Sequence, residues 1–383
     1  MITPRKIGGF IIPQRTMTDM FFSAANGMFS LLSEKTRVGF IDSLEAGIIQ
    51  EGVLSQATAG PMMMLSLFHD LQNPLFKKHK FDPNQFLQGL APSLESFHNI
   101  SAALENELDE INQNNISKKL EVNDENSKKS DHHSTSDEET SELGAVTKEE
   151  KESLLSALRI MTENDEFDAK QIQRKNAQAI LDHEWLNEAR DHPDSLAGQL
   201  SRMVTKELFQ INQLSSKTAF LLQNRDILFR EGSCRVNNVA LLSARACLFK
   251  EKEGSDSLNN DDSKISATEY EPLDYNLDYD VKESETAVAA QLEVLYDVTQ
   301  EFVLRKSTSS NPTEMNGVSS SSDSSSKSAN SFDNDESTHT TIVSVATIEG
   351  WLHGGPDNGE LRWKLASYRP PYEFPGIEHA YKY

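Results

Sequence analysis

The stretch Thr340–Arg369, TTIVSVATIEGWLHGGPDNGELRWKLASYR, decides the fold that this sequence predicts. Its centre, HGGPDNG, is rich in turn-forming residues, and period-two patterns flank it, so we expect two long strands joined by a turn. Apolar residues occur on both faces of the first strand. One face is formed by Val343, Val345, Thr347, Glu349 and Trp351. The other is formed by Ile342, Ser344, Ala346, Ile348 and Leu352. This pattern predicts a hairpin that is covered on one side and partly covered on the other.

Composition limits how much of the 383-residue chain packs into a core. Only 37% of the residues are hydrophobic, the mean hydropathy is −0.54, and the formal net charge is −23. Most of that charge lies in three polar segments, 105–145, 252–285 and 307–340. Such segments bury too little apolar area to offset their chain entropy, so we predict three long disordered inserts. The remainder is close to neutral, which excludes nucleic-acid binding through bulk charge.

Few residues suggest metal, redox or membrane-spanning chemistry. Cys234 and Cys247 are the two cysteines, and we interpret both as small apolar fillers in a reducing compartment. His132 and His133 lie inside an expected insert without further fixed ligands. No apolar run approaches the roughly 20 residues of a membrane span. We therefore expect no metal, no cofactor and no catalytic residues.

A long amphipathic helix is predicted after residue 81. Asp82 is suited to cap its N-terminus and Pro83 to occupy its first turn. Apolar residues then recur at spacings of three and four, as in an amphipathic helix. They are Phe86, Leu87, Leu90, Leu94, Phe97, Ile100 and Leu104. Pro92 is expected to kink or split this helix.

Three lysines just before this helix form the most concentrated basic patch in the chain: Lys77, Lys78 and Lys80. One interpretation is an ordinary solvated linker. The other is a contact with anionic lipid, since basic side chains are attracted to such surfaces.

The second half of the chain changes to a period of two. Val236–Phe249 and Ala287–Arg305 read as long strands, and the first places Leu242, Ala244, Ala246 and Leu248 on one face. Helices followed by about four long antiparallel strands predict an α+β domain. We expect N-terminal helices on a curved sheet that forms a cone with an apolar mouth. The candidate pocket or core residues are Phe86, Leu90, Leu94, Glu349, Trp351, Trp363 and Leu365.

Several of these segments resemble the Tim-forty-four-like domain family. FDPNQFLQGLAPSLESF is similar to the family's opening helix, through Phe81, Asp82, Phe86, Leu87 and Gly89. LAGQLSRMVTKELF resembles its next short helices. VATIEGWLHG and LRWKLASYR are similar to its closing hairpin, through Glu349, Trp351, Trp363 and Leu365. Leu90 departs from the family pattern, which has a small residue after the glycine, and the inserts are longer than usual.

The resemblance implies a fold, a location and a set of partners. The fold would be a cone like nuclear transport factor two, with a targeting and helical extension over 1–75 and the domain over 76–383. The location would be the matrix side of the mitochondrial inner membrane. Partners would be a translocase, an insertase, the ribosome or a membrane protease, with anionic lipid as a further ligand. Arg5, Lys6 and Arg15 precede the first acid, Asp19, which suits a transit peptide.

Three functions are compatible with the sequence. The first is a non-enzymatic peripheral inner-membrane adaptor in mitochondrial protein import, insertion or membrane-protein biogenesis. The second is a small-molecule-binding or enzymatic cone-fold protein, in which Glu349, Tyr296 and His353 would have to converge in a pocket. The third is a soluble non-mitochondrial scaffold with phosphorylated serine-rich loops.

Overall fold

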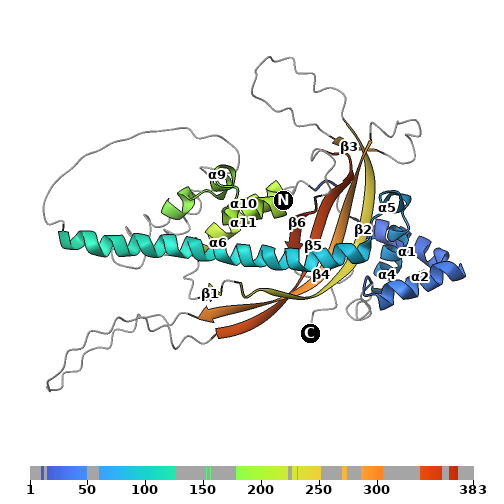
Figure 1. Ribbon diagram of the computed structural model, residues 1–383, viewed down its shortest axis with the longest axis horizontal. Coiled ribbons are helices and arrows are strands. Elements are labelled where there is room, and N and C mark those ends of the chain that lie inside the picture. Colours follow the sequence, from blue (N-terminus) through green and yellow to red (C-terminus); the bar gives the residue numbers. More distant parts are fainter. Residues whose placement is uncertain are drawn as a thin grey trace, which may run out of the picture.

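The computed structural model is an α+β protein in which helices pack on both faces of one curled antiparallel sheet (Figure 1). It describes residues 10–12, 15–49, 60–125, 152, 156, 178–222, 227–230, 232–251, 270–273, 286–304, 337–355 and 362–369. The N-terminal helices are α1 (Met17–Ser30), α2 (Glu34–Glu45), α4 (Gly60–Leu71) and α5 (Pro74–Lys78). The later helices are α6 (Pro83–Glu125), α9 (Trp185–Asp191), α10 (Leu196–Met203) and α11 (Lys206–Leu222).

The sheet has six strands, three of which are long. They are β1 (Ile227–Phe229), β2 (Arg235–Glu251), β3 (Tyr270–Pro272), β4 (Thr286–Leu304), β5 (Ser337–His353) and β6 (Lys364–Arg369). The order is β3-β2-β4-β5-β6, and β1 pairs with β4. Every pairing is antiparallel. The predicted strands therefore correspond to β2, β4, β5 and β6, while the two three-residue strands were not predicted.

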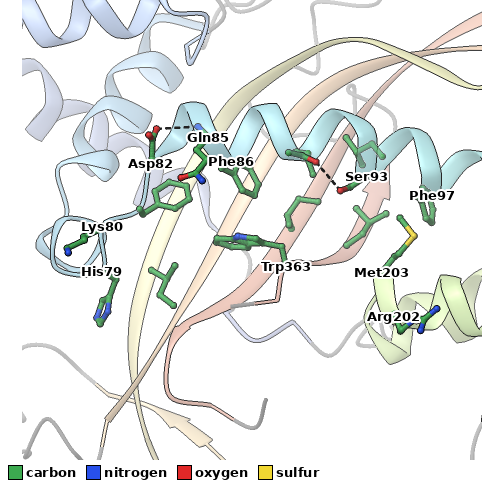
Figure 2. A pocket seen from close by; sticks show the side chains of 17 residues that line it. His79, Lys80, Asp82, Gln85, Phe86, Ser93, Phe97, Arg202, Met203 and Trp363 are labelled. Carbon is green, nitrogen blue, oxygen red and sulfur yellow. Dashed lines mark hydrogen bonds between the residues drawn. The ribbon is translucent and has the colours of Figure 1, made fainter. Parts of the chain in front are cut away.

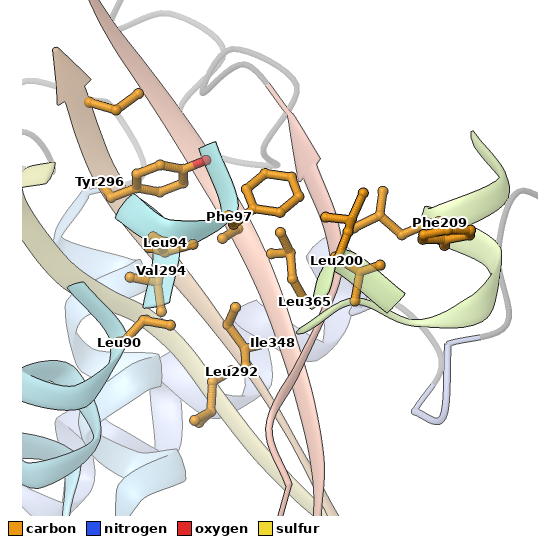
Figure 3. Close-up of a cluster of buried hydrophobic side chains, with 14 of the residues drawn as sticks. Leu90, Leu94, Phe97, Leu200, Phe209, Leu292, Val294, Tyr296, Ile348 and Leu365 are labelled. Carbon is orange, nitrogen blue, oxygen red and sulfur yellow. The ribbon is translucent and has the colours of Figure 1, made fainter. Parts of the chain in front are cut away.

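Alternation along the strands separates two cores. On the first face Ala346 and Ile348 of β5 lie beside Val294 and Leu292 of β4. Figure 3 shows this core, in which α6 contributes Leu90, Leu94 and Phe97. On the second face Val345 of β5 packs with Leu295 of β4, and Trp351 with Ala289. The hairpin is thus covered on both sides, and the face assignments made from the sequence are correct for β5.

Helix α6 covers the first face, and its sequence explains both its start and its orientation. The Asp82 carboxylate accepts hydrogen bonds from the backbone N–H of Asn84 at 2.9 Å and of Gln85 at 3.3 Å. The apolar stripe is buried through Leu104 and Leu108. Pro92 does not split the helix, because it lies on the exposed side, where water can satisfy the carbonyl that loses its partner.

Helices α1 and α4 are mounted on the second face. Met20 of α1 and Met63 of α4 pack with Leu242, Leu295 and Val345 of the sheet. The segment after α2 adds to the edge of the sheet, since Ile49 forms a parallel bridge with Leu241.

The predicted inserts are wrong at their edges. Helix α6 continues to Glu125, because Leu108 and Ile111 extend its apolar stripe beyond residue 105 and offset the polar composition. Tyr270–Pro272 forms β3, and Tyr270 packs on Trp351 with ring centroids 4.9 Å apart. Strand β5 begins at Ser337, inside the third predicted insert. The remaining parts of the predicted inserts, 126–145, 252–269, 274–285 and 307–336, lie outside the described residues.

Candidate binding pocket and apolar surface

A cavity of about 490 Å³ opens between α6 and the first face of the sheet. Figure 2 shows that α6 forms one wall, with Trp363 opposite it and the end of α10 at one side. Five residues predicted as pocket or core line it: Phe86, Leu90, Leu94, Trp363 and Leu365. The volume and apolar lining are typical of a site for a small ligand or a few apolar side chains.

An aromatic cluster forms the wall near Trp363. The ring centroid of Trp363 lies 5.0 Å from that of Phe86 and 5.9 Å from that of Phe81, both in edge arrangements. Gly350 of β5 makes room for the indole, because a Cβ atom there would lie 2.8 Å from its Cε3 atom. Trp363 is therefore held by packing, and its remaining surface faces the cavity.

The rim of the pocket is polar and carries both signs of charge. His79, Lys80 and Asp82 lie at one side, and Arg202 of α10 lies at the other. Lys80 has a φ of 53°, a left-handed conformation that glycine adopts more readily. Its backbone N–H bonds the carbonyl of Lys77 at 3.2 Å, so the strained residue ends α5.

Glu349 and Trp351 lie in the core of the opposite face and do not line the pocket. The cause is the alternation of side chains along β5, which directs Ile348 and Leu352 into the cavity. The Glu349 carboxylate accepts hydrogen bonds from the backbone N–H of Ile11 at 3.0 Å and from the Gln291 amide at 2.8 Å. Burial raises the pKa of Glu349, and this effect outweighs the hydrogen bonds, which lower it. Glu349 therefore anchors the N-terminal segment.

The three residues considered for catalysis do not converge. Tyr296 lies on the first face, where its hydroxyl is 2.9 Å from Nε2 of His98. His353 is exposed and stacks on His79, with ring centroids 5.4 Å apart. Since Glu349 occupies the second face, no pair of these groups shares a site.

Most of the exposed large apolar side chains among the described residues lie on α1, α2 and the turn between them. Eight large apolar residues there are each between 46% and 84% exposed: Met17, Phe21, Phe22, Met28, Phe29, Leu32, Val38 and Ile41. Single exposed apolar residues are common on monomeric proteins, but gatherings of large ones are not, and they mark interaction sites. We call these eight residues the apolar surface.

Several site residues were missed by sequence reasoning. Arg202 and Met203 reach the pocket from the end of α10, far from the other lining residues in the sequence. No local pattern marked Arg202. The sequence predicts short helices over 20–72 that pack on other elements or lie on a surface with Lys77–Lys80. It does not determine which side of α1 is exposed, because apolar residues on a short helix are equally compatible with a buried face.

Comparison with protein-family models, with curated proteins and with solved structures finds no match to this chain. The resemblance drawn from the sequence therefore stays a prediction. Among the described residues, no helix combines the length and apolar character needed to cross a membrane.

Proposed function

We propose that this chain is a non-enzymatic peripheral adaptor of the mitochondrial inner membrane, acting in protein import, insertion or membrane-protein biogenesis. We further propose that its fold is the cone of the Tim-forty-four-like family. The observation that carries the first proposal is the apolar surface on α1 and α2. The adaptor would lie on the bilayer through this surface and hold a partner segment in the pocket.

The attachment of α1 to α4 fixes which side of α1 faces outward. A Cβ atom at Gly27 would lie 2.2 Å from the Leu65 carbonyl oxygen, so the two helices touch at backbone distance. The Ser23 hydroxyl donates to the Asp70 carboxylate at 2.6 Å, and the Arg15 guanidinium pairs with the same carboxylate. Turning α1 over would break these contacts, so the phenylalanines stay outside.

The chemistry of the apolar surface suits lipid acyl chains. Phenylalanine, methionine and leucine side chains have no polar groups that need a partner in the membrane. Full burial of such a side chain contributes about 1.5–3 kcal/mol, so completing the burial of half-exposed ones contributes about 1 kcal/mol each. Amphipathic helices in the plane of a bilayer bind in this way.

Liposome binding tests the role of the apolar surface. We expect the full chain to sediment with vesicles of phosphatidylcholine and cardiolipin, and Phe22→Ser/Phe29→Ser to lower the bound fraction strongly. The matched control is Ile211→Ser/Ile342→Ser, which replaces two exposed apolar residues on α11 and β5. Binding of the phenylalanine variant at the level of the unmutated protein would contradict the proposal.

The basic patch is expected to add an electrostatic contribution. Lys77, Lys78 and Lys80 are exposed at the end of the molecule that carries α1 and α2 (Figure 1). Each lysine near an anionic surface contributes about 1 kcal/mol. Replacing all three with glutamate should weaken binding to cardiolipin vesicles and leave binding to neutral vesicles unchanged. Equal binding by both proteins would remove this patch from the mechanism.

Location and mode of attachment are tested in cells. A fluorescent fusion to the C-terminus of the full chain should reach mitochondria, and carbonate should release it from their membranes. A cytosolic fusion would exclude the proposed location and leave the scaffold hypothesis. Crosslinking and mass spectrometry on isolated mitochondria would then identify which translocase, insertase, ribosome or protease is the partner.

A further inference from the structure

Three potential metal ligands meet where the second half of α6 approaches α9. Glu107 comes from α6, His183 from the segment before α9, and Glu188 from α9. Their ligand atoms all lie within 4.8 Å of one another. We propose that these residues bind a divalent transition-metal ion, with Zn²⁺ as the best match to one imidazole and two carboxylates.

Two atoms in this cluster are buried without a hydrogen-bond partner. Nε2 of His183 and Oε2 of Glu188 are both withdrawn from solvent and have no hydrogen-bond partner among the described residues. They lie 3.9 Å apart, too far for a direct hydrogen bond. Buried polar atoms are normally satisfied, so a bound ion or water is expected between them. Glu107, on the facing helix, provides the third oxygen donor.

The spacing is compatible with coordination after small side-chain movements. Zinc binds imidazole nitrogen and carboxylate oxygen at about 2.0–2.2 Å, which places neighbouring ligands of a tetrahedral site about 3.4 Å apart. His183 Nε2 and Glu188 Oε2 are 3.9 Å apart and no pair of ligand atoms is more than 4.8 Å apart, so side-chain rotation can bring them to this spacing. Three protein ligands leave the fourth position for water.

The charges around the cluster favour a cation. A third carboxylate lies close to Glu107 and Glu188: Glu110, one turn further along α6. The opposing charge is Lys217 of α11, whose ammonium group donates to the Leu181 carbonyl at 3.0 Å and is directed to that oxygen. Three carboxylates against one ammonium leave the region acidic.

A metal here would connect two elements that the chain joins only over a long distance. Glu107 and His183 are far apart in the sequence, and the segment between them includes residues 126–151, which lie outside the described part of the chain. An ion shared by α6 and α9 would fix the position of α9 and hence of Trp185, which is buried at its start. The site is independent of the apolar surface and of the pocket.

Isothermal titration of the full chain with ZnCl₂ tests the site. The unmutated protein should bind one equivalent, and Glu107→Gln/His183→Asn should lose more than about tenfold in affinity, since even outer partners of metal ligands are worth about 10- to 100-fold. The matched control is Glu45→Gln/His192→Asn, which removes the same two side-chain types from exposed positions on α2 and after α9. Its affinity should equal that of the unmutated protein.

A thermal melt shows whether a loss of zinc binding is caused by a loss of the fold. Zinc should raise the melting temperature of the unmutated protein and of the control, because it binds the folded state, but not that of Glu107→Gln/His183→Asn. If that double variant is unfolded without metal, Glu188→Gln replaces it in both measurements. Three results would overturn the proposal: no binding by the unmutated protein, undiminished binding by the ligand variant, or an equal loss in the control. Undiminished binding would indicate an adventitious site elsewhere, such as His132 and His133.

Discussion

Helices α1 and α6 are both amphipathic, but α6 buries mostly large apolar side chains, whereas α1 buries mostly small ones beside Met20. Helix α6 buries large apolar residues such as Leu94 and Phe97 against the sheet. Helix α1 buries Ser23 and Gly27 against α4 and leaves Phe29 exposed. In Figure 1, α6 crosses the sheet and α1 lies at one end of the molecule.

The difference separates residues needed for folding from residues available for binding. The large side chains of α6 contribute directly to the core, so the fold depends on them. Helix α1 is attached by backbone contact at Gly27 and by the Ser23–Asp70 hydrogen bond. Its exposed phenylalanines contribute little to stability in water, which is why we assign them to an external partner.

The largest expected effect compares two leucine-to-alanine substitutions. Leu104 on α6 is 0% exposed, and Leu32 after α1 is 84% exposed. Leu104→Ala removes packed methyl groups and leaves a cavity, so it should cost roughly 4 kcal/mol of unfolding free energy. Leu32→Ala should change it by less than about 0.5 kcal/mol. Urea denaturation measures both, and a similar cost at the two positions would contradict the proposed division of roles.

A second expected effect concerns pH and comes from a buried histidine of α6. Burial lowers the pKa of His98 from 6.5 to about 4. The unfolded chain therefore takes up a proton that the folded protein does not, so the contribution of His98 to stability is constant above pH 6.5 and falls between 6.5 and 4. At 1.36 kcal/mol per pKa unit the loss is about 3 kcal/mol. Nε2 of the imidazole lies 2.9 Å from the Tyr296 hydroxyl oxygen, within hydrogen-bond distance.

Substitution of His98 isolates this contribution. His98→Gln should flatten the fall in unfolding free energy between pH 6.5 and 4 by about 3 kcal/mol relative to the unmutated protein. His192→Gln, at an exposed position, should leave the slope unchanged. Identical slopes in the His98 variant and the unmutated protein would show that burial of this imidazole does not govern acid stability.

The sequence predicts those parts of the fold that depend on how apolar residues are spaced within a single helix or strand. The stripe of α6 and the two faces of β5 follow from spacings of 3.6 and 2 within one element. These spacings also identify five pocket-lining residues, because they lie on the inner sides of α6 and of the hairpin. The α+β class follows from the order of the elements.

Features set by a partner element were not predictable. Leu242 was expected beside Ala244, but a register shift between Leu241 and Ser243 places it with Met20 on the second face. Such a bulge depends on how β2 pairs with β4. The outward side of α1 depends on α4 in the same way. Residues Glu107 and His183 are brought together only by the packing of α9 near α6.

The smallest expected effect comes from two glycine-to-alanine substitutions, one on each helix. At Gly89 of α6 no atom lies within 4 Å of a built Cβ, so alanine should stabilise the protein by about 0.5–1 kcal/mol through its higher helix propensity. At Gly27 of α1 the same methyl group would meet the Leu65 carbonyl at 2.2 Å. Overpacking of this kind costs about 1–3 kcal/mol, less the propensity gain.

The two substitutions also differ in where the damage should appear. Gly27→Ala should raise amide exchange in α1 and α4 and leave α6 protected, because α1 would separate from α4 before the sheet opens. Gly89→Ala should leave exchange in α1 unchanged. If Gly27→Ala were as stable as the unmutated protein, α1 would not be held at backbone distance, and the outward orientation of its phenylalanines would lose its structural cause.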